Sequence, residues 1–319
     1  MHLYINFPSW ISPLVIPGLP IRWYSVMYLV AFGLTYVLVM YQVRKDDLGF
    51  THDDMASLFM WTIIGLLLGA RLFAALFYDP TGYYLRNPWM VFWPFRSGRF
   101  VGFQGMSYHG GLTGAVVGGL LYCRKQKISF LQMADLFTAA IPLGYTFGRI
   151  GNFINGELWG RVTAMPWGVV FPFAPRFSAR HGWVRDIADT VGISYETGGM
   201  VNLPRHPSQL YEAALEGILL WVVLWFIIRK RSAYPGFMLS MYLVGYGAAR
   251  FIAEYFREPD SELGFIIALG REQEPAAVFH SLLNISMGQL FSALMIAAGV
   301  LLAFLFKRRA VMMGIISKR

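Results

Sequence analysis

The sequence has few charged residues and a single cysteine. Charged residues make up 14% of its 319 residues, whereas 56% are hydrophobic. A soluble domain usually carries about a quarter charged residues, so this composition excludes an ordinary soluble domain and favours a membrane protein that crosses the bilayer several times. With Cys123 as the single cysteine, a disulfide framework and a cysteine-based zinc site are both excluded.

The net charge of +9 does not indicate a nucleic-acid partner. Lysine and arginine form no stripe on a polar face studded with aromatic residues, which is the pattern that binds nucleic acid. The first twenty residues contain no lysine or arginine, so we do not expect a cleavable signal peptide. No cofactor motif occurs either. We therefore expect an integral membrane protein that uses neither a metal nor a cofactor.

Apolar stretches predict an all-α fold. A bilayer core of about 30 Å requires about twenty mainly apolar residues per helix. Seven stretches meet this requirement, and they run at about 22–43, 55–78, 106–123, 130–150, 208–228, 236–257 and 288–306. We expect one integral membrane domain over residues 1–319, with a long outer insertion at 151–207 that contains a short strand within 167–172. The third range is rich in glycine, and the fourth contains Asp135 and Pro142.

Basic residues predict the orientation. The clusters at 44–47, 124–127, 229–231 and 307–309 follow the first, third, fifth and seventh ranges, and all six lysines, Lys318 included, lie on this same side. Because cytoplasmic loops are enriched in lysine and arginine, this side is predicted to be cytoplasmic. The N-terminus is then periplasmic and the C-terminus cytoplasmic.

The predicted outer loops contain arginine but no lysine. Their arginines are at positions 86, 96, 99, 161, 176, 180, 185, 205 and 271. These residues are either solvated charges that anchor to headgroups or an outward surface that binds anionic lipid, since a guanidinium grips phosphate at two points. The two halves of the chain also lack matching broken helices, which argues against a transporter.

The sixth range carries a polar stripe. Tyr246, Arg250, Glu254 and Arg257 recur at helical spacing, so they share one face of a helix. One interpretation is an internal Arg250–Glu254 pair that neutralises itself, with Arg257 at the membrane interface. The other is a site in which Glu254 orients Arg250 to bind an anion. Glu212 and Glu216 of the fifth range are four residues apart and can line the same cavity.

The third range begins with His109 and with glycines at four-residue spacing. Gly110, Gly114 and Gly118 predict close helix packing through small residues. His109 is either a structural residue or a group that transfers protons. It has no second histidine or acid at ligand spacing, so we expect no metal site there.

The stretch "GRIGNFINGELWG" at 148–160 gathers polar residues where an apolar range ends. Together with "YHGG" at 108–111 and "YGAARFIAEYFREPD" at 246–260, it resembles the bacterial prolipoprotein diacylglyceryl transferase family over essentially the whole chain. This resemblance implies transfer of the diacylglyceryl group of phosphatidylglycerol to the lipobox cysteine of a prolipoprotein signal peptide, with release of glycerol phosphate. It also implies a place in the bacterial inner membrane, among membrane lipids, with the active site toward the periplasm.

The resemblance also implies site residues. His109, Arg149, Arg250 and Tyr246 are the implied catalytic residues. The implied substrate-binding residues are Arg149, Asn152, Asn155, Glu157, Gly160, Tyr24 and Glu254. Some members carry a histidine two residues before the first-span tyrosine, where this chain has Arg22, so that histidine has no counterpart here.

The implied chemistry needs cations and a proton acceptor. Arg149 and Arg250 can bind the departing phosphate. His109, or less directly Tyr246, can accept the thiol proton, which must leave because the thiolate is the nucleophile. Cys123 lies at the predicted inner end of its span and is expected to be dispensable. Two alternatives stay open: a transporter or scramblase of anionic lipids, and a structural subunit whose buried charges only pair.

Overall fold

The computed structural model describes residues 3–19, 21–96, 98–100, 105–259, 264–269 and 276–316. Asp260, Arg271 and Lys318, named above, lie outside these residues, as does the side chain of Arg96. The described chain is mostly helical, with a few two-stranded sheets in the segments between the long helices.

Each of the seven predicted ranges contains a helical segment. They are α1 (Trp23–Lys45), α2 (His52–Phe77), α4 (Tyr108–Gln126), α5 (Phe130–Ile154), the segment Ser208–Arg231, α9 (Phe237–Ala253) and α10 (Met287–Met312). Among the described residues, four helices are long and apolar enough to cross a membrane: α1, α2, Ser208–Arg231 and α10. The chain is therefore a helical membrane protein with at least these candidate spans.

The fifth segment changes its hydrogen-bond pattern along its length. It begins as α7 (Ser208–Glu212), continues as the π-helix η2 (Ala213–Leu219) and α8 (Leu220–Val222), and ends as the π-helix η3 (Val223–Ile228) and the 3-10 turn η4 (Arg229–Arg231). Gly217 of η2 lies so close to α5 that a Cβ there would be 2.1 Å from Oγ1 of Thr146. π-Helical turns often occur at functional sites, and this one begins directly after Glu212.

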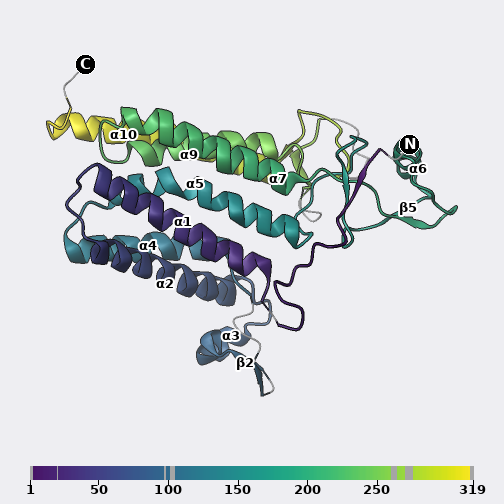
Figure 1. Cartoon of the computed structure of the whole chain (residues 1–319), viewed down its shortest axis with the longest axis horizontal. Coiled ribbons are helices and arrows are strands. Elements are labelled where there is room, and N and C mark those ends of the chain that lie inside the picture. The colour runs from purple at the N-terminus through teal and green to yellow at the C-terminus, as the bar shows by residue number, and fades with distance from the viewer. Residues whose placement is uncertain are drawn as a thin grey trace. The chain divides into compact units, whose positions relative to one another are not determined.

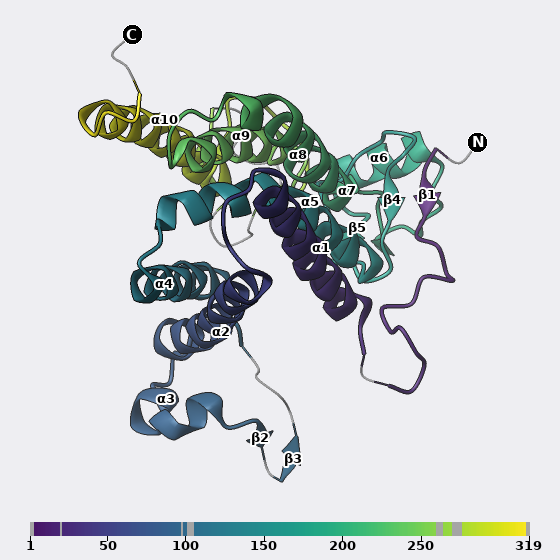
Figure 2. The same cartoon turned by 60° about the vertical axis from the view of Figure 1, so that its left-hand side comes forward.

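The chain divides into two compact units, one of residues 1–38 and 134–319 and the other of residues 39–133. In the second unit α2 and α4 lie side by side (Figures 1 and 2). Gly65 and Gly69 of α2 meet Gly110, Gly114 and Gly118 of α4 so closely that a Cβ at these positions would be 2.0–2.4 Å from a backbone oxygen or from a side-chain carbon. The prediction that glycines pack this helix is confirmed.

The second unit also contains the segment between α2 and α4. It forms α3 (Tyr83–Arg86), η1 (Pro88–Phe92) and a hairpin of β2 (Phe95–Arg96) with β3 (Arg99–Phe100). Buried Arg71 of α2 fixes it by donating hydrogen bonds to the carbonyl of Val91, to the carbonyl of Gly105 at 3.2 Å and to the hydroxyl of Tyr84 at 2.9 Å.

In the first unit α9 and α10 lie side by side, as Figure 1 shows. Gly247 of α9 and Gly299 of α10 permit this approach, because a Cβ on either would be 2.9 Å from a backbone oxygen of the other helix. Helix α5 packs against α1 in the same way, since a Cβ on Gly144 would be 2.8 Å from Oγ1 of Thr35. Small residues let apolar helices approach where no hydrophobic effect drives them together.

The insertion after α5 is a small folded cap. It contains β4 (Val169–Val170), which pairs in parallel with β1 (Ile5–Asn6), the antiparallel pair β5 (Phe177–Ser178) and β6 (Met200–Val201), and α6 (Gly182–Val191). A further antiparallel pair joins β7 (Phe265–Ile267) to β8 (Ile285–Ser286). The predicted strand within 167–172 is confirmed as β4. The insertion begins later than predicted because α5 continues to Ile154.

Two arginines of this cap contradict the sequence interpretation. Arg161 and Arg205 were expected to be solvated or to face lipid headgroups, but their exposed fractions are 2% and 0%. Nε of Arg161 donates to the carbonyl of Arg257 at 2.8 Å, and Nη1 of Arg205 bonds Glu258 and the carbonyl of Gly160. Aromatic rings cover both guanidinium groups. These arginines therefore hold loop segments together.

Asp135 of α5 is a helix cap. Its carboxylate accepts hydrogen bonds from the backbone N–H of Gly236 at 2.7 Å and of Leu239 at 2.9 Å, which are at the start of α9. Gly236, the residue before α9, has no side chain to cap it. An acid that satisfies the free N–H groups of a helix N-terminus stabilises that helix.

Asp135→Ala is expected to lower the free energy of unfolding by about 1–2 kcal/mol, because two N–H groups lose their acceptor. Asp135→Asn keeps one acceptor oxygen and should lower the free energy of unfolding by less. Thermal unfolding in detergent measures both. Equal melting temperatures for the wild type and Asp135→Ala would contradict the capping role.

Candidate functional site

The polar cluster of residues 148–160 begins on the last turns of α5. Arg149 and Asn152 lie on the helix, and the chain then turns through Gly156, which has a φ of +65°. Asn152 and Asn155 both donate to Oε1 of Glu157, at 2.9 and 3.3 Å. The loop therefore folds back so that both amides meet this carboxylate, and Oδ1 of Asn152 accepts from Nη1 of Arg149 at 3.5 Å.

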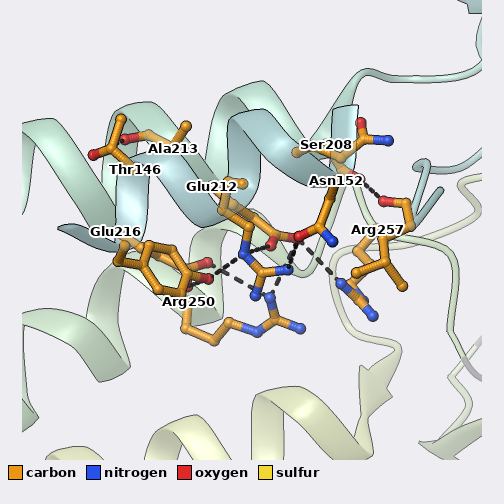
Figure 3. A network of polar contacts seen from close by, with 12 residues as sticks. Thr146, Asn152, Ser208, Glu212, Ala213, Glu216, Arg250 and Arg257 are labelled. Carbon is orange, nitrogen blue, oxygen red and sulfur yellow. Dashed lines mark hydrogen bonds and ion pairs between the residues drawn. The ribbon is translucent and has the colours of Figure 1, made fainter. Parts of the chain in front are cut away.

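The centre of the site is the buried carboxylate of Glu212 on α7. Its Oε2 is 2.8 Å from Nε of Arg149, and its Oε1 is 3.2 Å from Nη1 of Arg250 and 3.3 Å from Nη1 of Arg257. Figure 3 shows Glu212 with Arg250 and Arg257, and the exposed fraction of Glu212 is 0%. One carboxylate thus gathers three guanidinium groups from α5, α9 and the residues after α9.

Two further carboxylates complete the network. Glu216, one turn after Glu212, lies 3.6 Å from Nη1 of Arg250, and the hydroxyl of Tyr145 donates to it at 2.6 Å. Glu254 pairs with Nη2 of Arg250 at 2.8 Å. Three arginines therefore face three glutamates, and an ion in an apolar region is tolerated because it has a partner.

The arginines retain hydrogen-bonding capacity. Arg149 and Arg250 each expose 17% of the side chain, whereas Glu212 and Glu216 are buried. Among the described residues, Nη1 of Arg250 and Oε2 of Glu212 are near opposite charges but make no aligned hydrogen bond. The part of each guanidinium that stays exposed can bind an oxyanion in this low-dielectric setting.

The predicted tyrosines lie beside the same helices. The ring of Tyr246 on α9 contacts that of Tyr145 edge to face, with centroids 5.8 Å apart. Tyr24 at the start of α1 lies against α5, because a Cβ on Gly151 would be 3.4 Å from its Cα, and its hydroxyl is 2.9 Å from that of Tyr28. The structure thus brings together Tyr24, Arg149, Asn152, Asn155, Glu157, Tyr246, Arg250 and Glu254 in the first unit.

His109 lies in the second unit, as the second residue of α4 after its N-cap Ser107. Its side chain is exposed, and its ring lies 6.5 Å from that of Phe73 and 5.8 Å from that of Tyr108. It lies at the start of α4, directly after the segment that joins α2 to α4. Within its own unit, His109 is therefore accessible to a ligand.

Gly160 serves backbone packing. A Cβ there would be 2.3 Å from the carbonyl oxygen of Phe256 and 2.8 Å from Cβ and the carbonyl oxygen of His206. The backbone N–H of Gly160 donates to His206 at 2.9 Å, and the neighbouring N–H of Arg161 donates to Phe256 at 2.9 Å. Only glycine allows these segments to approach so closely, and they lead directly to Glu212 and Arg257.

The sequence interpretation missed the central role of Glu212 and the parts played by Tyr145 and Arg257. It used Glu212 only to line a cavity and placed Arg257 at the interface. The spacing of Glu212 and Glu216 within an apolar span was the available signal, because two acids at membrane depth need cationic partners. Their partners lie on other helices, so spacing along one helix did not identify them.

The fold and the site define a class: a helical membrane protein with a buried charge network that can bind an anion. The sequence profile of prolipoprotein diacylglyceryl transferase matches residues 13–305. The chain is 49% identical to the phosphatidylglycerol–prolipoprotein diacylglyceryl transferase of Treponema denticola, with 94% of each chain covered. It is also 49% identical to that of Treponema pallidum, over 93% of this chain and 94% of the relative, and 41% identical to that of Chlorobaculum tepidum, over 97% and 96%. The chain belongs to the prolipoprotein diacylglyceryl transferase family.

Gly160→Ala is expected to destabilise the protein by about 1–3 kcal/mol, because the methyl group must displace backbone atoms. Gly148→Ala is the matched control, since a Cβ there has no neighbour within 4 Å. Thermal unfolding of both variants in detergent measures the difference. A Gly160→Ala protein as stable as the control would contradict the packing role.

His206 is expected to make stability depend on pH. Burial and the nearby charge of Arg161 lower the pKa of His206 from 6.5 to about 4. Between these values the unfolded chain binds the proton more readily than the folded protein, so stability falls as the pH is lowered through this window. His206→Gln removes the group and should flatten the melting temperature between pH 7 and pH 4.5. Parallel profiles for the two proteins would contradict this prediction.

Proposed function

We propose that the chain transfers the diacylglyceryl group of phosphatidylglycerol to the lipobox cysteine thiol of prolipoproteins. The product is a thioether, glycerol phosphate is released, and the reaction is the first step of bacterial lipoprotein maturation. Membership of the family and the names of relatives at 41–49% identity support this activity. The observation that carries it is the pair Arg149 and Arg250, both held by the buried carboxylate of Glu212.

The reaction places particular demands on the site. The thiol sulfur forms a bond to the glyceryl carbon while the bond from that carbon to the phosphate oxygen breaks. The electron pair leaves with glycerol phosphate, and the thiol proton passes to a base. Negative charge therefore grows on the departing phosphate. Arg149 and Arg250 are suited to bind it through charge-assisted hydrogen bonds, which are strong where water is scarce.

The thiol proton needs an acceptor because a free cysteine, with a pKa of about 8.5, is mostly protonated at neutral pH. We assign this role to His109, since an imidazole can accept a proton near neutral pH. Its exposed side chain at the start of α4 supports access. Tyr246 beside Arg250 is the second candidate, through its hydroxyl.

The remaining predicted residues are proposed to hold the lipid headgroup. The amides of Asn152 and Asn155 and the carboxylate of Glu157 can bind its hydroxyl groups, and Glu254 orients Arg250 through their 2.8 Å ion pair. The proposed substrate-binding set is Tyr24, Arg149, Asn152, Asn155, Glu157, Gly160 and Glu254. For Gly160 the proposed contribution is the close backbone packing that fixes this loop.

We propose that the chain crosses the bacterial inner membrane seven times, with a periplasmic N-terminus and a cytoplasmic C-terminus. The helical segments at the seven predicted ranges and the lysines gathered on one predicted side support this arrangement. The site at residues 148–160 then lies toward the periplasm. Its substrates would enter from the membrane as a phospholipid and a signal peptide.

Arg149→Ala and Arg250→Ala are each expected to lower transfer at least about 100-fold, because each removes a cation that stabilises the leaving phosphate. Purified protein is mixed with phosphatidylglycerol and a lipobox peptide, and mass spectrometry measures the gain of one diacylglyceryl group on the peptide cysteine. Circular dichroism checks that the variants remain folded. Turnover near the wild-type rate in either folded variant would contradict the two-arginine mechanism.

Cys123→Ser is the control and should keep full activity, because this buried thiol lies near the far end of α4 from His109. The same assay separates the alternatives. A transporter or scramblase would move lipid between leaflets without adding mass to the peptide. A structural subunit would do neither.

A further inference from the structure

The first turn of α10 encloses the carboxylate of Glu254. The hydroxyl of Ser286 donates to Oε1 of Glu254 at 3.1 Å. A Cβ on Gly288 would be 2.5 Å from the same oxygen and 2.6 Å from the carboxyl carbon. The carboxylate therefore occupies the space that a side chain at position 288 would fill.

This turn is itself held in place. Ser286 is the N-cap of α10, and it forms a capping box in which its hydroxyl accepts from the N–H of Gln289 at 3.2 Å while Oε1 of Gln289 accepts from the N–H of Ser286 at 3.0 Å. Ser286 and Gln289 expose 2% and 1% of their surface. The donor to Glu254 thus has a fixed position, and the helix N-terminus favours the negative charge of the acid.

The other oxygen of the carboxylate faces Arg250. Oε2 of Glu254 is 2.8 Å from Nη2 of Arg250, whose Nη1 lies 3.2 Å from Glu212. Arg250 is therefore held between two carboxylates, and one of these is placed by α10. Any displacement of Glu254 must move or release the guanidinium.

We propose that Ser286 and Gly288 are positioning residues for Arg250, acting through Glu254. This inference rests on the proposed function, in which Arg250 binds the departing phosphate. A displacement of about 1 Å at a catalytic group can lower a rate about 100-fold, so the absence of a side chain at Gly288 is required for activity.

Gly288→Ala is expected to lower the rate of diacylglyceryl transfer at least tenfold. Gly33→Ala is the matched control, because it is also a helical glycine but has no neighbour within 4 Å of a built Cβ. It should keep the wild-type rate. Both proteins are assayed with phosphatidylglycerol and the lipobox peptide, and their melting temperatures are measured in detergent.

A second pair separates positioning from helix capping. Ser286→Asn and Ser286→Asp have similar volumes, and both residues are good N-caps. The asparagine amide can donate to Glu254, whereas the aspartate carboxylate repels it. We expect at least tenfold slower transfer for Ser286→Asp than for Ser286→Asn, with circular dichroism checking that both variants remain folded. Equal rates for the two would overturn the role of Ser286.

A compensating change tests the route through Glu254. Glu254→Asp shortens the side chain by one methylene and leaves room for a methyl group at position 288. Adding Gly288→Ala to Glu254→Asp should therefore lower the transfer rate less than threefold, whereas the same substitution in the wild-type background lowers it at least tenfold. The same loss in both backgrounds would overturn the inference.

Failure of this inference is distinct from failure of the proposed function. If the wild-type protein adds no diacylglyceryl group to the peptide, the proposed function is wrong, and the inference fails with it. If the wild type is active and Gly288→Ala matches Gly33→Ala, only the positioning inference is wrong.

Discussion

A buried carboxylate that must be neutralised organises this protein. Glu212 has no exposed surface, so its charge is tolerated only because Arg149, Arg250 and Arg257 lie within 3.3 Å. Removing one member of a buried ion pair typically costs about 3–5 kcal/mol. The same contacts fix α5, α7 and α9 relative to one another within the first unit, so the requirement for charge neutrality also sets the geometry in which the arginines are presented.

The segments around the network serve this geometry. Gly160 lets three pieces of backbone approach closely, Asp135 caps α9, and Ser286 caps α10 while it binds Glu254. Each contact satisfies a backbone or charged group that would otherwise be buried without a partner, which is costly in an apolar setting. Two of these contacts bear on Arg250, because Asp135 caps the helix that carries it and Ser286 binds the acid that pairs with it.

Small residues perform a second task in the membrane-embedded part. Between apolar helices in lipid, close packing replaces the hydrophobic effect as the source of association. The glycines of α2 and α4, and those of α9 and α10, bring backbones into direct contact. The cap is built differently, around a compact apolar core that includes Val184 and Leu203. Its buried arginines lie under aromatic rings.

The sequence by itself determined the helical ranges, the glycine packing of α4 and the family, because apolar length, small-residue spacing and the polar cluster at 148–160 are local patterns. It also indicated the Arg250–Glu254 pair, since both residues lie on one helix face. Tertiary structure alone decided that Glu212 joins three arginines, that Arg161 and Arg205 are buried, and that α10 encloses Glu254. The contacts of Glu212 and Glu254 join residues more than 30 positions apart, and the burial of Arg161 and Arg205 cannot be read from composition. Both depend on how the helices and the cap pack.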